Sequence, residues 1–107
     1  MGLTTDRTDP ALREIESDGP RKGQQKSYLV LSEEERAKGF VRPVRDKYTH
    51  VACGVVTTMG SALAETYARD PKFYGGTFCC GCGKHFRLIN PDGSPAFHWE
   101  DGEAVGS

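Results

Sequence analysis

The sequence is short of apolar residues and has no long apolar run. Hydrophobic residues make up 36% of the 107 positions, whereas about half the residues of a compact globular chain are usually apolar. The shortage is greatest over residues 1–27, whose only apolar side chains are Met1, Leu3, Ala11, Leu12 and Ile15. These differences predict a flexible polar tail over residues 1–27, one folded domain over residues 28–103 and a frayed end over residues 104–107.

Signals for membranes and export are also missing. No segment approaches the run of about 18 apolar residues that indicates a membrane helix, and the first residues do not form a signal peptide. We therefore expect a cytoplasmic protein without membrane contact. In a reducing cytosol, the four cysteines are more often metal ligands or catalytic groups than disulfides.

Motifs that indicate catalysis are absent as well. The sequence has no HExxH helix, no glycine-rich phosphate loop and no deaminase-type pairing of histidine and glutamate with a proline–cysteine motif. Thr57, Thr58 and Ser61 have no evident base nearby in the sequence. We predict that the protein is not an enzyme. The alternative is an enzyme built around a metal ion that keeps an open coordination position.

The net charge of −1 argues against a chain that is basic throughout, but the charges are unevenly distributed. Residues 21–47 carry eight basic and four acidic side chains, whereas residues 90–107 carry four acidic and none basic. The segment RPVRDKY concentrates Arg42, Arg45, Lys47 and Tyr48. Two interpretations stay open. This strand contacts phosphate or an acidic partner, with the tyrosine stacking on a base, or it is simply a solvated strand face.

Two five-residue segments repeat one pattern of metal ligands. HVACG at 50–54 and CCGCG at 79–83 each contain a ligand, two further residues, a cysteine and a glycine. Ligands at this spacing can hold one ion from a tight turn, and the glycine lets the backbone fold back toward the sulfurs. Two such turns complete a tetrahedron. The pattern therefore predicts a zinc ion bound by His50, Cys53, Cys79 and Cys82.

The fourth ligand position stays open in the sequence, because His85 and Cys80 compete with His50. Other interpretations of the cysteines are ordinary burial, a disulfide between Cys79 and Cys80, and redox chemistry at the CxxC motif. A redox motif belongs at a helix start, whereas this one leads into a strand. A filled shell predicts a structural zinc ion. Such an ion can supply ~10–16 kcal/mol of folding free energy, while so small a core supplies ~3–5 kcal/mol.

With its paired turns, the chain resembles zinc-ribbon and zinc-knuckle proteins over residues 50–54 and 79–83 and the segment that follows. It differs from a usual ribbon because a helix separates the two turns. The stretch from GFVRPVR to GCGKHF also resembles small uncharacterised proteins of bacteriophages and prophages. This resemblance implies a bacterial cytoplasm or a virion as the setting, and it implies no activity.

The remaining patterns predict a small α+β fold with two short helices. The first helix covers residues 32–39, with Ser32 and Glu35 as a capping box. The second is capped by Thr57 or Thr58 and ends near Arg69. Strands over 85–89 and 96–100 flank the turn NPDGSP and predict a C-terminal β-hairpin.

Together, these features predict a zinc-stabilised ribbon-like domain that acts as a binding module. The expected partner is a protein of the host or of the virus, which would make the chain a phage accessory protein. The alternative is a nucleic-acid-binding zinc ribbon that uses the basic strand. The sequence does not indicate an oligomeric state.

Overall fold

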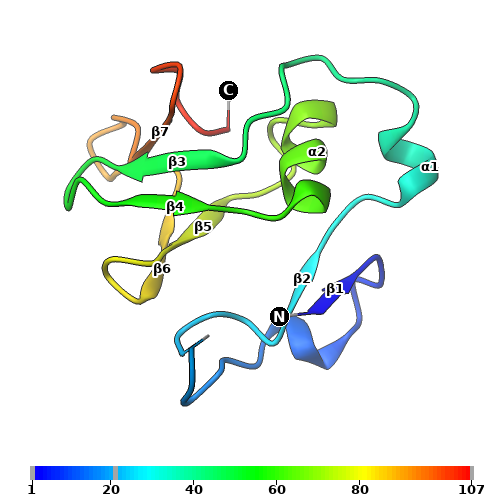
Figure 1. Ribbon diagram of the computed structural model, residues 1–107, viewed down its shortest axis with the longest axis horizontal. Helices are drawn as coiled ribbons and strands as arrows, with labels where there is room; N and C mark the ends of the chain where they lie inside the picture. The colour runs from blue at the N-terminus through cyan, green and yellow to red at the C-terminus, as the bar shows by residue number, and fades with distance from the viewer. Residues whose placement is uncertain (1, 21, 107) are drawn as a thin grey trace.

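The computed structural model describes residues 2–20 and 22–106 and shows a compact α+β domain (Figure 1). Met1, Arg21 and Ser107 lie outside the described residues. The elements in chain order are β1 (Gly2–Thr4), the 3-10 helix η1 (Pro10–Leu12), β2 (Ser27–Leu29), α1 (Glu33–Arg36), β3 (Lys47–His50), β4 (Val56–Thr58), α2 (Ser61–Arg69), β5 (Gly76–Cys79), β6 (Lys84–Arg87) and β7 (Phe97–Trp99). The predicted α+β class with two α-helices is confirmed.

The strands form three separate small sheets. An antiparallel sheet of order β4-β3-β7 has β3 at its centre, β5 and β6 form an antiparallel pair, and β1 pairs with β2 in parallel. In the central sheet, Tyr48 lies opposite Thr57 on β4 and opposite Trp99 on β7. The centre of the fold therefore joins segments that are far apart in the sequence.

The predicted C-terminal hairpin is present only at its turn. The prediction is wrong for its two strands, which pair with other segments. Ile89 and Pro95 form an antiparallel bridge, but β6 then pairs with β5 and β7 pairs with β3. Phe97 and Trp99 are 0% and 2% exposed and pack edge-on against Tyr48. Aromatic burial against β3 is worth more than pairing with the charged β6 could provide.

Both helices lie where the sequence predicted them, but α1 ends at Arg36 and is shorter than the predicted 32–39, and α2 has a different cap. Ser32 caps α1 by accepting a hydrogen bond from the Glu35 backbone N–H at 3.2 Å. The cap of α2 is Gly60 and not Thr57 or Thr58, because both threonines belong to β4 and pair with β3. Pairing in the sheet prevails over the local preference of threonine for a cap.

The core lies between α2 and the central sheet. Tyr67 of α2 meets Trp99 edge-on at 5.3 Å between ring centroids. Tyr67 of α2 is buried in this core, Leu63 of the same helix packs against it, and Met59, which precedes the helix, is also buried there. As Figure 1 shows, α2 lies beside the central sheet.

The division into a tail, a domain and a frayed end stays a prediction, but the described residues at both ends make defined contacts. The Val30 N–H donates to the Thr4 carbonyl at 2.9 Å, and β1 pairs with β2. Val105 is 3% exposed, and its N–H donates to the Phe97 carbonyl at 3.0 Å. Residues on either side of the predicted domain therefore pack onto it.

Candidate metal centre

The two repeated segments fold into turns with matching backbone geometry. We call residues 50–54 the first knuckle and residues 79–83 the second knuckle. The Gly54 N–H donates to the His50 carbonyl at 2.7 Å, and the Gly83 N–H donates to the Cys79 carbonyl at 2.8 Å. The two glycines have φ angles of 73° and 70°, a conformation that other residues adopt only at a cost. The two segments that share a sequence pattern therefore also share a backbone conformation.

The knuckles bring the four predicted ligands together. One ligand atom from each of His50, Cys53, Cys79 and Cys82 lies within 4.8 Å of all the others. The Sγ atoms of Cys53 and Cys79 are 3.5 Å apart, and the Sγ atom of Cys82 is 3.6 Å from Nδ1 of His50. A tetrahedral zinc ion would separate two sulfurs by about 3.8 Å and a sulfur from a nitrogen by about 3.5 Å. This donor set could therefore bind a metal ion such as zinc.

Aromatic packing fixes the histidine of the site. The His50 ring stacks on Phe97 at 4.8 Å between ring centroids and also packs against Phe86 at 4.4 Å. His50 and Cys79 are buried, while Cys53 and Cys82 reach the surface. The ring thus needs little reorganisation to present Nδ1, and the two surface thiols give an ion access to the site.

The pKa values of Cys53 and Cys82 shift in opposite directions. A backbone hydrogen bond from Val55 is the main cause that lowers the pKa of Cys53. Desolvation, followed by the nearby Cys79 and Cys53, raises the pKa of Cys82 to about 11. Three thiolates so close together repel one another. A bound dication would offset that repulsion and favour all three thiolates.

The two competing ligands lie outside the cluster. Cys80 is exposed, and its thiol lies 3.4 Å from the Val56 carbonyl oxygen. The His85 Nε2 atom lies 2.8 Å from the Tyr28 hydroxyl, and its ring meets Phe78 edge-on. The geometry therefore favours His50 as the fourth ligand. No pattern in the sequence indicated that Phe86 and Phe97 pack against His50.

The four residues considered as partner contacts do not share one surface. Tyr48 is buried and donates a hydrogen bond to the Phe78 carbonyl. Arg45 is also internal: its side chain is 10% exposed, pairs with two carboxylates of the 101–103 segment and lies over the Trp99 ring at 4.9 Å. Arg42 and Lys47 are exposed. Two of the four predicted contact residues, Arg45 and Tyr48, therefore stabilise the fold.

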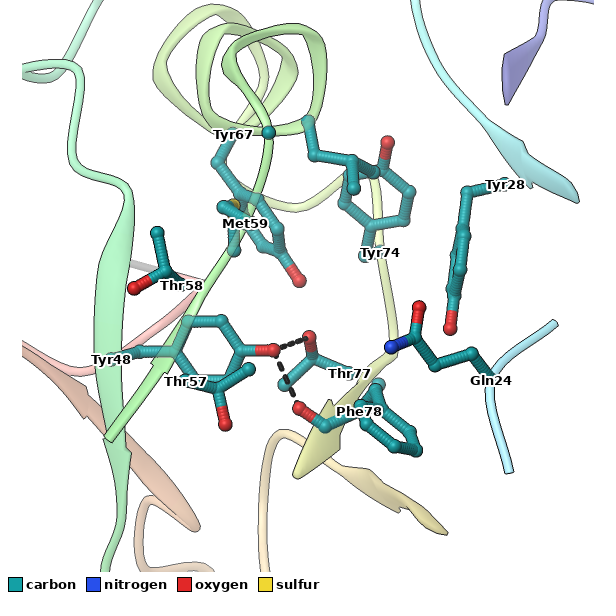
Figure 2. Close-up of a pocket in the computed structure, with 13 residues that line it drawn as sticks. Gln24, Tyr28, Tyr48, Thr57, Thr58, Met59, Tyr67, Tyr74, Thr77 and Phe78 are labelled. Carbon is teal, nitrogen blue, oxygen red and sulfur yellow. Dashed lines mark hydrogen bonds between the residues drawn. The ribbon is translucent and has the colours of Figure 1, made fainter. Parts of the chain in front are cut away.

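A small cavity lies between the core and the N-terminal segment. Its volume is about 90 Å³. Figure 2 shows Tyr48 and Tyr67 on one side, and Tyr28 and Gln24 approaching from the N-terminal segment. None of the described residues that line it is charged. Burial raises the pKa of Tyr48 to about 12 and also raises that of Tyr67. The cavity thus has room for a few waters or a small uncharged group, and its phenols stay neutral near pH 7.

The N-terminal segment also covers the second knuckle. A Cβ atom added to Gly23 would lie 2.2 Å from the Gly83 carbonyl oxygen. The Tyr28 hydroxyl lies 2.8 Å from His85 and accepts a hydrogen bond from the Gln25 N–H at 3.2 Å. This close packing gives Gly23 a role that the sequence did not indicate.

No family model, curated protein or solved structure matches the chain. The resemblances to zinc ribbons and to phage proteins therefore stay predictions, and the candidate site depends on the geometry of this chain. None of the helices in residues 2–20 and 22–106 is long and apolar enough to cross a membrane.

Proposed function

We propose that the protein is a non-enzymatic binding module whose fold is held by one structural zinc ion. The observation that carries this proposal is the convergence of His50, Cys53, Cys79 and Cys82 from two knuckles of matching geometry. Zinc, when bound, would neutralise the thiolates and link the two sheets. Four protein ligands fill a tetrahedron, so no position is left for a reacting water.

The knuckles explain why the ion would matter for stability. The first knuckle follows β3 in the central sheet, whereas the second knuckle joins β5 to β6 in another sheet. An ion bound by both would connect two sheets that have no common ladder of hydrogen bonds. Because its binding free energy becomes folding free energy, it would compensate for the small core.

Native mass spectrometry of protein purified without chelator tests the zinc assignment. We expect one zinc ion per chain, and we expect a chelator to remove the ion together with the folded structure. A metal-free chain whose mass is lower by about two or four units, from oxidised thiols, would overturn the assignment. The same measurement gives the oligomeric state.

We propose another protein as the partner, in the phage or prophage setting that the sequence resemblance implies. The alternative, nucleic-acid binding, has less support from the positions of the side chains. Tyr48 is buried and cannot stack on a base, and Arg45 is paired with carboxylates. Steep salt dependence of binding to an oligonucleotide would instead favour the nucleic-acid role.

A further inference from the structure

The outer edge of β6 has backbone groups without partners. In the β5–β6 pair, Cys79 lies opposite Lys84 and Thr77 lies opposite Phe86. The Leu88 N–H continues the ladder by donating to the Gly75 carbonyl at 3.0 Å. The even-numbered residues of this strand therefore bond to β5.

The odd-numbered residues consequently point their backbone groups outward, since the two directions alternate along an antiparallel strand. These residues are His85, Arg87 and, beyond the strand, Ile89. Within residues 2–20 and 22–106, no residue forms a hydrogen bond with their N–H or carbonyl groups. The edge thus has the alternating pattern of free donors and acceptors that another strand could pair with.

The surroundings of this edge are basic. Lys84 and Arg87 are exposed on β6, and Lys72 lines the groove at its end. None of the three takes part in a salt bridge within the described residues. The groove has a volume of about 840 Å³, and its lining among residues 2–20 and 22–106 contains no acidic side chain. Although the Lys84 Nζ atom lies over the Phe86 ring at 5.3 Å, positive charge that no carboxylate pairs with favours an acidic ligand.

An apolar side chain marks the same place. Ile89 is 63% exposed, the highest exposure among the large hydrophobic residues of the described chain that lie at the surface. It lines the groove together with Leu88 and Val105, which are buried. A ligand that extends along β6 would cover Ile89 at its end.

We propose that the outer edge of β6 binds an extended acidic segment of another protein by strand addition. This inference rests on the proposed binding function and names its surface. A second copy of the chain is disfavoured as the occupant, because pairing two β6 edges would bring Lys84 and Arg87 of both copies together. A nucleic acid is disfavoured because the edge has no exposed aromatic ring: Phe86 is partly buried against His50.

The probe is a fluorescent nine-residue peptide of alternating glutamate and valine, used with the zinc-loaded full chain. Two further peptides carry backbone N-methyl groups on alternate residues. One is methylated on every glutamate and the other on every valine. Strand addition predicts that one register binds at least about tenfold more weakly than the other, because only one set of N–H groups faces β6. Equal loss in both registers, or no binding of the parent peptide, overturns the proposal.

Charge reversal tests the position of the site. Lys84→Glu combined with Arg87→Glu should weaken binding by about tenfold. Arg42→Glu is the matched control, because Arg42 is exposed and its guanidinium bonds only to its own neighbour, the Val41 carbonyl, at 3.4 Å. We expect NMR shifts at the amides of His85, Arg87 and Ile89. Loss of binding only with Arg42→Glu, or binding of an oligonucleotide in place of the peptide, overturns the proposal.

Zinc content and circular dichroism of each protein separate the two proposals. A folded chain without metal that still binds the peptide in one methylation register only would refute the structural zinc ion. The same result would support the β6 edge as the binding surface. One zinc ion per chain without peptide binding would refute the surface and leave the zinc assignment intact.

Discussion

Two adjacent cysteines provide the sharpest test of the metal centre. Cys79 is 0% exposed, and its sulfur lies 3.5 Å from that of Cys53. Cys80 is exposed, and its thiol contacts only the Val56 carbonyl oxygen. Cys79→Ser and Cys80→Ser make the same chemical change at neighbouring positions. They should nevertheless have very different effects.

The magnitude follows from the number of ligands. A structural zinc site contributes ~10–16 kcal/mol in apparent binding, so one ligand in four is worth roughly 2.5–4 kcal/mol. The apolar core of a domain this small supplies ~3–5 kcal/mol. Cys79→Ser should therefore lower the free energy of unfolding by about as much as the whole apolar core contributes. Cys80→Ser should change the free energy of unfolding by about 0.5 kcal/mol or less, as is usual for exposed positions.

Urea unfolding followed by tryptophan fluorescence measures this difference. Trp99 is the single tryptophan of the chain, and it is 2% exposed in the core. Replacement of zinc by cobalt adds a second readout, because cobalt–thiolate absorption reports the ligands directly. Equal destabilisation by the two serine variants would refute the reasoning. So would a cobalt spectrum that changes with Cys80→Ser and not with Cys79→Ser.

Three further predictions concern the residues around the site. Gly23→Ala should release the N-terminal segment from the second knuckle, because its Cβ would lie 2.2 Å from the Gly83 carbonyl oxygen; hydrogen exchange in that segment should rise, and unchanged exchange would contradict the packing. Stability should fall as pH rises from about 10 to about 12, because burial raises the pKa of Tyr48 to about 12 and a raised pKa favours the folded state only below it. Tyr48→Phe should flatten this part of the pH–stability curve, and equal slopes in the two proteins would argue against it. Arg45→Gln should lower the melting temperature through the loss of about 1 kcal/mol, since its side chain pairs with two carboxylates and covers Trp99, whereas the exposed Arg42→Gln should leave the melting temperature unchanged.

The candidate site was predictable because its information is local. Each knuckle is five residues long, and ligand spacing and the glycine at its end specify its turn. The sequence could not choose among His50, His85 and Cys80 on spacing alone. That choice depends on Phe86 and Phe97, which come from different strands and both pack against the ring of His50.

The errors arose where distant residues decide the local structure. Thr57 and Thr58 are good helix caps, but their pairing with β3 places them in a strand and leaves Gly60 as the cap. The turn after Ile89 was predicted correctly, whereas its flanking strands separate to pair with other segments. Short strands carry weak signals of their own, so tertiary burial selects their partners.

The arrangement of the knuckles has a consequence for the order of folding. Each knuckle connects strands that are adjacent in the sequence, β3 with β4 and β5 with β6, so each can form from local contacts alone. The pairing of Tyr48 with Trp99, in contrast, must close a loop of about fifty residues. We expect the ion to be held first by one pair of ligands, with the second pair arriving when the two hairpins meet. Metal concentration should then set the folding rate as well as the final stability, so that a chain starved of metal would wait in an open state with both hairpins formed.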